Sequence, residues 1–374
     1  MKQASESLVG ERIVEGLGVR NWLARFDRWT GGLTPPRAKL VYRTTFALAV
    51  TTTIFLLGWF ESGLISPVNA QDVTYFRIAT GGPGSQSFEI AGDISKAISN
   101  PVTTNDCDPG DNCGVPGVIG MAQTTAGALE SLKLLRQGQV DGAIVQADMA
   151  ALAAGGKGPF KSVGPDATLR AIATVGDTAL QVIVPEKSDL HTFSDLKGHR
   201  LAISSIEADG TISTNQILTQ LGVVNKKTKL IPLSLSDAVA QLISGKVDAL
   251  AVMDRRNLPD VMGISDHMSV RLLSITDADM TKIGTDRHDF ILAHLPAGTD
   301  GSAAPADTLI VPILFVVSAQ TDNTVAFDLA KTLVVPKRGA KTTANPAASS
   351  PDAHIESTVI PLHPGVQRLL ETTN

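Results

Sequence analysis

The sequence is poor in aromatic residues and has almost no cysteine. Phe, Trp and Tyr make up only 4% of its 374 residues, and two residues are cysteine. Ala, Gly, Val and Leu are plentiful, which favours the aliphatic cores of α/β proteins and disfavours a coiled coil or a disordered chain. At about 150 residues per domain, the length suggests two compact units with additional segments.

Motifs of common catalytic sites are absent. The sequence contains no HExxH, no GxSxG and no cysteine with a positioned base. Of its seven histidines, His288 lies between Asp286 and Asp289, which could suggest a metal or acid–base site. We interpret the histidines as scattered exposed residues. The sequence therefore predicts no enzyme, no catalytic residue and no cofactor.

The sequence also has fewer basic than acidic residues. The formal net charge is −5, and the part of the chain beyond residue 70 is more acidic than the whole. No basic stripe remains there to hold nucleic acid. This balance excludes a nucleic-acid partner.

The N-terminal part has a different character. Thr44–Phe60 carries no charge, follows Arg37, Lys39 and Arg43, and precedes the small-x-small pattern Val68–Ala70. We interpret residues 1–70 as a basic segment with either a cleaved export signal or an uncleaved anchor through 44–60. No cysteine follows the apolar run at a lipobox position. The rest of the chain is therefore expected in the periplasm.

The two cysteines lie close together in a turn-rich segment. Cys107 and Cys113 are six positions apart, which in an oxidising compartment favours a disulfide. Asp106, Asp108 and Asp111 offer a metal site as the alternative. Mixed thiolate and carboxylate ligation without histidine is poor zinc chemistry, and the aspartates do not have calcium-loop spacing. We favour the disulfide.

Beyond residue 70 the hydrophobic pattern alternates between helix and strand. We expect helices over 88–98, 126–135, 212–221 and 235–243, with one strand over 143–145 and another over 178–184 that follows the stretch 169–175. The phrase Gly245–Val252 repeats Gly138–Val145. The repeat predicts two similar α/β lobes.

A glycine-rich turn, Ile78–Ser87, joins an expected strand to an expected helix. Such turns bring the backbone close to a ligand and lead into a helix N-terminus, whose free N–H groups attract anions. The turn fits neither GxxxxGK[ST] nor a clean GxGxxG. It is a candidate carboxylate cradle, although a glycine-rich turn of this kind, taken alone, is more often a plain strand-to-helix connection.

Seven phrases together resemble one family, the extracytoplasmic solute-binding proteins of TRAP transporters, TAXI type. In family order they are Ile78–Gly84, Ala122–Leu132, Gly138–Gln146, Leu169–Ala173, Asp195–Arg200, Gly245–Ala249 and Pro296–Thr299. The resemblance extends from Val73 to Val334. It implies a two-lobed type II periplasmic binding fold with two crossing strands, a small solute such as an amino acid or carboxylate, and TRAP membrane permease subunits as partners.

With this fold, lobe 1 would comprise 71–183 completed by 296–374, and lobe 2 would comprise 184–295. The stretch 336–354, rich in Ala, Ser, Thr and Pro, is expected to be a flexible insert. A last short helix with Ile360, Val366 and Leu369 is expected to dock beyond it. A membrane-anchored sensor or interaction protein with the same fold is the alternative function.

The candidate ligand-binding residues lie at expected helix starts and strand ends. They are Gly81, Gly82, Ser85, Gln86, Ser87, Thr124, Thr125, Gln146, Asp148, Asp177, Asp209, Gly210 and Thr211. Each also fits a turn or a helix cap. Arg255 and Arg256 could bind a carboxylate or be solvated surface residues.

Two of these positions carry specific expectations. Where the family has aromatic residues after its glycines, this chain has Ser85, Gln86 and Ser87. We expect Gly82→Val to prevent closure through steric and φ-angle conflict. Asp209 is expected to cap its own helix, and its charge would repel a ligand carboxylate, so an amino group or a neutral or cationic ligand portion must be considered.

Overall fold

The computed structural model describes residues 73–100, 114–284, 287–334, 354–355 and 359–373. The chain divides into two compact units, 1–70 and 71–374, and the described residues all belong to the second. The expected signal or anchor, the two cysteines and residues 336–353 of the expected insert lie outside this part. None of the helices in these ranges is long and apolar enough to cross a membrane.

The described strands form one mixed sheet and one short pair. Along the main path the order is β4-β1-β5-β12-β6-β9-β7-β8, with β10 paired to β6 and β11 to β12. The strands are β1 (Thr74–Thr80), β4 (Val118–Thr124), β5 (Gly142–Gln146), β6 (Leu169–Pro185), β7 (Arg200–Ser204), β8 (Lys229–Pro232), β9 (Ala249–Asp254), β10 (Val270–Leu272), β11 (Ile291–Leu295) and β12 (Ala306–Ser318), with β2 (Ser99–Asn100) and β3 (Val115–Pro116) as the pair.

Two long antiparallel strands, β6 and β12, join the two ends of the main sheet. Residues 169–179 of β6 pair with β12, and residues 179–183 pair with β9. In the opposite direction, β12 passes from β11 to β5. We call β4, β1 and β5 with their helices the first half, and β9, β7 and β8 with theirs the second half. The predicted α/β fold with two crossing strands is confirmed.

Strand β6 is longer than the sequence predicts. A strand is expected only over 178–184, but Leu169–Pro185 is one continuous strand. Gly176 has an ordinary strand conformation here. Its missing side chain instead lets Ile90 of the neighbouring helix approach, since a Cβ there would lie 3.0 Å from Ile90 Cδ1.

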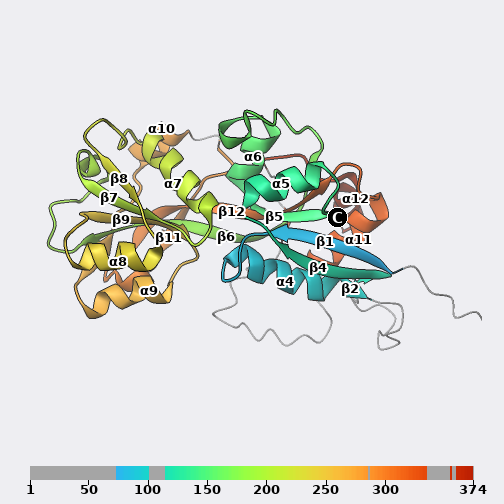
Figure 1. The fold of residues 1–374 in the computed structure, drawn as a ribbon, viewed down its shortest axis with the longest axis horizontal. Coiled ribbons are helices and arrows are strands. Elements are labelled where there is room, and N and C mark those ends of the chain that lie inside the picture. Colours follow the sequence, from blue (N-terminus) through green and yellow to red (C-terminus); the bar gives the residue numbers. More distant parts are fainter. Residues whose placement is uncertain (1–72, 101–113, 285–286, 335–353, 356–358, 374) are drawn as a thin grey trace, which may run out of the picture. The chain divides into compact units, whose positions relative to one another are not determined.

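Helices cover both faces of each half (Figure 1). The α-helices are α4 (Gln86–Ile98), α5 (Ala128–Arg136), α6 (Ala147–Ala154), α7 (Ala208–Gln220), α8 (Leu235–Ile243), α9 (Pro259–Met262), α10 (Asp277–Ile283), α11 (Asn323–Val334) and α12 (Pro364–Thr373), and the short 3₁₀ turns are η1 (Gly158–Phe160), η2 (Phe193–Leu196), η3 (Gly263–Asp266) and η4 (Thr299–Gly301). In the first half, α5 and α6 lie opposite α4 and α11. In the second half, α7 and α10 lie opposite α8 and α9.

Three aliphatic clusters hold these layers together. One lies under α5, α6, α7 and α10, a second under α4, α11 and α12, and the third under α8 and α9. The predicted C-terminal helix is present as α12, with Val366 and Leu369 buried in the second cluster. His354, at the end of the expected insert, exchanges backbone hydrogen bonds with Thr174 of β6.

The predicted repeat is confirmed by the same local structure in each half. Asp141 accepts from the backbone N–H of Arg77 at 2.8 Å, and Asp248 accepts from that of Arg200 at 2.8 Å. Each arginine side chain also binds its aspartate and donates to the carbonyl of the preceding turn glycine. In both halves, the aspartate of Gly-x-Val-Asp therefore binds its turn to the adjacent parallel strand.

Candidate functional site

The glycine-rich turn connects β1 to α4 as expected. Ser85 is the N-cap of α4, and its hydroxyl accepts from Phe88 N–H at 3.2 Å. Ser87 Oγ accepts from Gly81 N–H at 2.9 Å and lies 3.0 Å from Thr80 Oγ1. The two serines therefore fold the turn back onto the end of β1, and both are buried.

The crowded glycine of this turn is Gly81 and not Gly82. A Cβ on Gly81 would lie 2.8 Å from the hydroxyls of Ser85 and Ser87 and 3.2 Å from Glu207 Cδ. Around Gly82 there is nothing within 4 Å, and its φ is not in the left-handed region. The φ-angle conflict expected for Gly82→Val is wrong, because the close approach occurs one residue earlier.

This difference gives a paired prediction. Gly81→Ala should destabilise the protein by about 1–3 kcal/mol, as overpacking of a tight site does, whereas Gly82→Ala should be nearly neutral. Urea unfolding of both variants measures the difference. Equal free energies of unfolding for the two variants would contradict the packing described for this turn.

Carboxylates of the second half lie at two helix N-termini of the first half. Glu207 Oε1 accepts from Ser87 N–H of α4 at 3.0 Å, and Asp209 Oδ2 accepts from Ala128 N–H of α5 at 2.7 Å. Unpaired N–H groups at a helix start attract anions. The chain's own carboxylates therefore occupy the positions at which the sequence suggested a ligand anion.

The local role predicted for Asp209 is wrong. Helix α7 begins at Ala208, its N-cap position is Glu207, and no side chain caps it. Asp209 lies in the first turn and its carboxylate reaches across to α5. The sequence did not single out Glu207, although a carboxylate beside a helix start is the signal that could have found it.

A second contact across the halves involves Asp148 after β5. The Ser213 hydroxyl of α7 lies 2.6 Å from Asp148 Oδ2 and 3.0 Å from Gln146 Oε1. Ser213 also was not predicted. It stands four residues after Asp209, so both side chains lie on the same face of α7.

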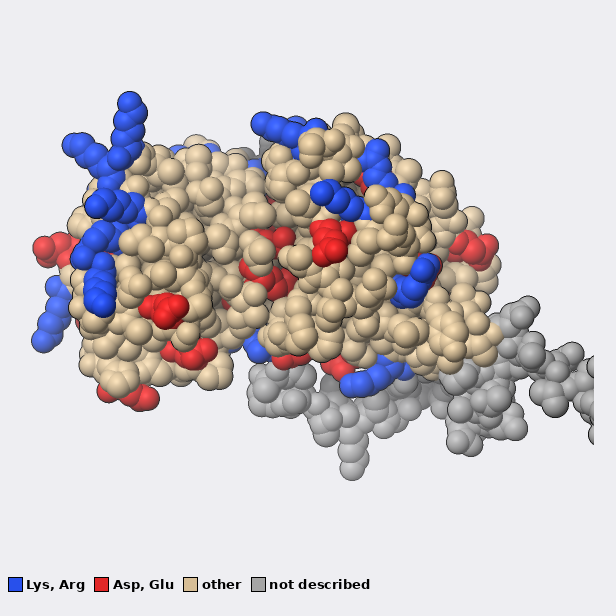
Figure 2. Space-filling model, in the orientation of Figure 1, with Lys and Arg blue, Asp and Glu red and all other residues tan. Residues whose placement is uncertain are grey.

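These contacts bury negative charge. Burial raises the pKa of Asp209 to about 7, and the charges of Glu207 and Asp148 contribute. Burial also raises the pKa of Asp148 to about 6 and that of Asp254 above its ordinary value. Within the described ranges, none of these four carboxylates forms an ion pair, and no group of three or more His, Cys, Asp or Glu is placed to hold a metal ion. Figure 2 shows acidic side chains gathered near the middle of the visible face, where α7 approaches α5.

Two arginines that follow β9 also bind carboxylates. Arg255 binds Glu89 of α4 at 2.6 Å, and Arg256 binds Asp177 of β6 at 2.7 Å. Gln86 Nε2 donates to the Asp177 carbonyl at 3.1 Å, and its buried Oε1 has no partner. Both arginines thus bind carboxylates, as one of the two interpretations of the sequence predicts. These carboxylates, however, belong to the chain itself and not to a ligand.

The remaining predicted residues take separate places. Thr124 is the exposed last residue of β4 and not part of a helix start. Thr125 donates to the Thr80 carbonyl at 2.9 Å and lies 2.8 Å from Ser131 Oγ. Gly210 and Thr211 lie in α7, and a Cβ on Gly210 would lie 2.5 Å from the Met253 carbonyl oxygen.

The histidine considered for acid–base chemistry, His288, is exposed. Its neighbour Asp289 pairs with Arg287, and Asp286 lies outside the described residues. The charges of Arg287 and Asp289 act on the pKa of Asp148, so the neighbours of His288 lie near one of the contacts between the halves.

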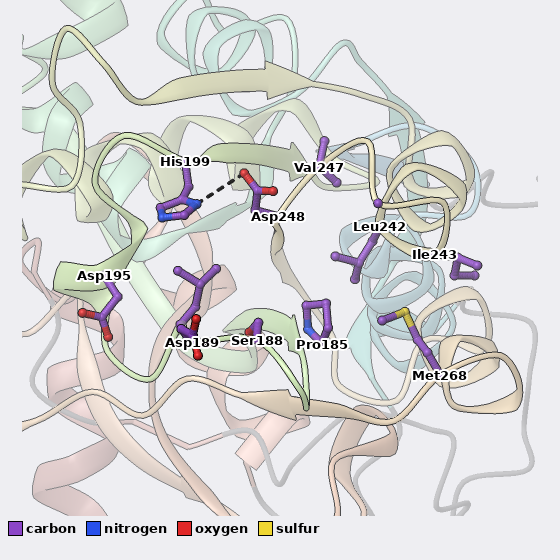
Figure 3. A pocket seen from close by; sticks show the side chains of 12 residues that line it. Pro185, Ser188, Asp189, Asp195, His199, Leu242, Ile243, Val247, Asp248 and Met268 are labelled. Atoms are coloured by element: carbon purple, nitrogen blue, oxygen red, sulfur yellow. Dashed lines mark ion pairs between the residues drawn. The ribbon is translucent and has the colours of Figure 1, made fainter.

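A distinct pocket of about 580 Å³ lies at the other end of the second half, where β7 and β9 begin. His199 Nδ1 and Asp248 Oδ2 lie 3.4 Å apart on one side of it, and Leu242, Val247 and Met268 line its apolar side (Figure 3). No predicted site residue lines this pocket. The predicted residues instead meet between the two halves.

The solved structures that are similar to this chain include the following three, each of low sequence identity to it. A Xanthomonas citri protein bound to ATP is 14% identical with a TM-score of 0.45, covering 80% of this chain and 99% of that one. The aliphatic sulphonate binding protein SsuA of Escherichia coli is 17% identical with a TM-score of 0.41, covering 80% and 90%. A probable amino-acid ABC transporter extracellular-binding protein of Bacillus subtilis is 13% identical with a TM-score of 0.38, covering 70% and 91%.

The comparison with protein families gives a match over most of the sequence. Residues 78–372 match the profile of the NMT1-like family. The matched range begins in β1 and ends in α12, so it includes both halves and both crossing strands. The chain therefore belongs to the NMT1-like family.

Proposed function

We propose that this protein is an extracytoplasmic solute-binding protein that holds a small solute between its two halves and delivers it to a membrane permease. The observation that carries the proposal is the set of direct contacts between the two halves. Among the described strands, β6 and β12 are the two that join these halves. The finer assignment to a TRAP-type transporter rests on the seven phrases shared with TAXI proteins. The proposal includes no catalytic step.

Opening and closing of the halves is the proposed binding movement. Four contacts would break on opening: Ser87 with Glu207, Ala128 with Asp209, Asp148 with Ser213, and Glu89 with Arg255. Each is a hydrogen bond or an ion pair. Opening therefore frees polar groups that a polar solute can bind, and β6 and β12 act as the hinge.

The freed groups suit a solute with both kinds of charge. The N–H groups of Ser87 and Ala128 would bind a carboxylate once Glu207 and Asp209 withdraw. The two withdrawn carboxylates would bind an ammonium group. An amino acid offers both groups on one small molecule, and a simple organic acid offers only the first.

Ligand-induced stabilisation tests the proposal. A solute that binds only the folded state should raise the free energy of unfolding by about 2.7 kcal/mol at a hundredfold excess over its dissociation constant. Thermal unfolding of the full chain should be measured with amino acids, dicarboxylates and 2-oxo acids at millimolar concentration. No shift with any of these solutes would overturn the proposal.

The buried amide of Gln86 gives a site-specific prediction. Its Oε1 lacks a partner and is available to a solute donor, so Gln86→Ala should weaken binding of the best solute by about 1–3 kcal/mol. His288→Ala is the control and should leave affinity unchanged. Calorimetry in which His288→Ala abolishes binding and Gln86→Ala is silent would contradict the assignment.

A further inference from the structure

Lysine side chains gather at the end of the second half where β7, β8 and β9 begin. Figure 2 shows Lys and Arg side chains massed at the left end of the visible face. The residues are Lys197, Lys226, Lys227, Lys229 and Lys246, all of them exposed. We call these five residues the lysine surface.

Hydrogen bonds hold the three loops that carry these lysines against one another. Gly198 N–H donates to Thr228 Oγ1 at 2.9 Å, and Lys229 N–H donates to the His199 carbonyl at 3.0 Å. The Arg200 guanidinium donates to the Gly245 carbonyl at 3.0 Å. The lysines are therefore presented together, although their side chains are free to move.

Within the described part of the chain, the five positive charges of the lysine surface outnumber the two negative charges of Asp189 and Asp195, which line the neighbouring pocket. None of its five lysines forms an ion pair there, while Asp248 is taken by Arg200 and His199. Asp195, close by in sequence, accepts hydrogen bonds from His191 and Thr192. This concentration of positive charge contrasts with the net charge of −5 for the whole chain.

We propose that the lysine surface binds anionic lipid headgroups at a membrane. Lysine is depleted at protein–protein interfaces, where Arg, Tyr and Trp are enriched, and Phe193, the aromatic residue nearest in sequence, is buried. Ammonium groups on flexible stems are compact point charges that need no shaped partner. An anionic bilayer attracts each such group near its surface, and the exposed Ile243 near Lys246 adds apolar contact.

The position of the lysine surface is compatible with solute binding. It lies where β7 and β9 begin, whereas the contacts with the first half lie beyond the ends of these strands. A membrane bound at one end of the half leaves the other end accessible. The proposal does not depend on the function proposed above.

Vesicle sedimentation of the full chain tests the proposal. Binding to phosphatidylcholine vesicles should increase when phosphatidylglycerol is included, and added salt should reverse the increase. The triple variant Lys226→Gln, Lys227→Gln, Lys229→Gln should lose about tenfold or more of this additional binding. The control triple variant Lys133→Gln, Lys157→Gln, Lys161→Gln removes the same amount of charge from the first half. It should keep the additional binding to phosphatidylglycerol vesicles.

Thermal unfolding of both triple variants verifies that they fold. An equal loss in the two variants would overturn the proposal, because net charge alone would then explain binding. Binding that does not increase with phosphatidylglycerol would also overturn it. So would lysine-dependent capture by polyglutamate without binding to anionic vesicles, which would assign an acidic protein partner instead.

Discussion

The protein should resist unfolding better at pH 5 than at pH 8, and Asp209→Asn should remove much of that difference. The pKa of Asp209 is raised to about 7 from 3.8, chiefly by burial, so the folded state binds the proton more tightly than the unfolded state. Stability is then lost as pH rises from about 4 through about 7. Each unit by which the folded-state pKa is raised lowers the free energy of unfolding of the ionised protein by about 1.4 kcal/mol. The expected effect is therefore on the order of a few kcal/mol.

Urea unfolding at several pH values between 5 and 8 measures this effect. Asn keeps an oxygen that can accept from Ala128 N–H but has no charge to bury, so the variant should be more stable than the wild type at pH 8. The exposed Asp93→Asn serves as the control and should keep the wild-type pH dependence. A wild type with the same stability across the range, or an Asp209→Asn variant with an unchanged slope, would refute the burial of this charge.

Gly210→Ala should be strongly destabilising, whereas Gly92→Ala should stabilise. A Cβ on Gly210 would overlap Ser205 Oγ and would lie 2.5 Å from the Met253 carbonyl oxygen at the end of β9. The serine can turn away, but the strand carbonyl cannot move without shifting the sheet, so a loss of about 1–3 kcal/mol is expected.

Gly92 provides the matched comparison within a helix. It lies inside α4, and a Cβ there has nothing within 4 Å. Alanine should therefore gain about 0.5–1 kcal/mol from helix propensity alone. Denaturant unfolding of both variants gives the two values. If Gly210→Ala were as stable as Gly92→Ala, the close packing of α7 on β9 would be contradicted.

Local patterns predicted the elements that carry the candidate site. The helix predicted over 235–243 matches α8, the turn after β1 leads into α4, and the Gly-x-Val-Asp repeat marks the same turn in both halves. These features depend on residues within one turn or one periodic stretch. Predictions from the sequence are strongest for features whose residues lie this close together along the chain.

Contacts between the halves could not be read from the same patterns. Asp209 is a good local cap by residue type, yet its partner Ala128 is 81 positions away, and Glu207 lies 120 positions from Ser87. Neighbouring glycines likewise look equivalent in sequence, but Ser85, Ser87 and Glu207 crowd Gly81 and leave Gly82 free. Such pairs depend on how α7 docks against α4 and α5, which no local pattern contains.

Hydrogen–deuterium exchange with the screened solute that gives the largest thermal shift tests the central claim most directly. Solute bound between the halves should slow exchange in peptides covering 81–90, 124–131 and 205–214. Peptides covering 157–163 and 226–229, away from these contacts, should be unchanged. Protection confined to the peptides that line the pocket around His199 and Asp248, with none at the starts of α4, α5 and α7, would contradict the account.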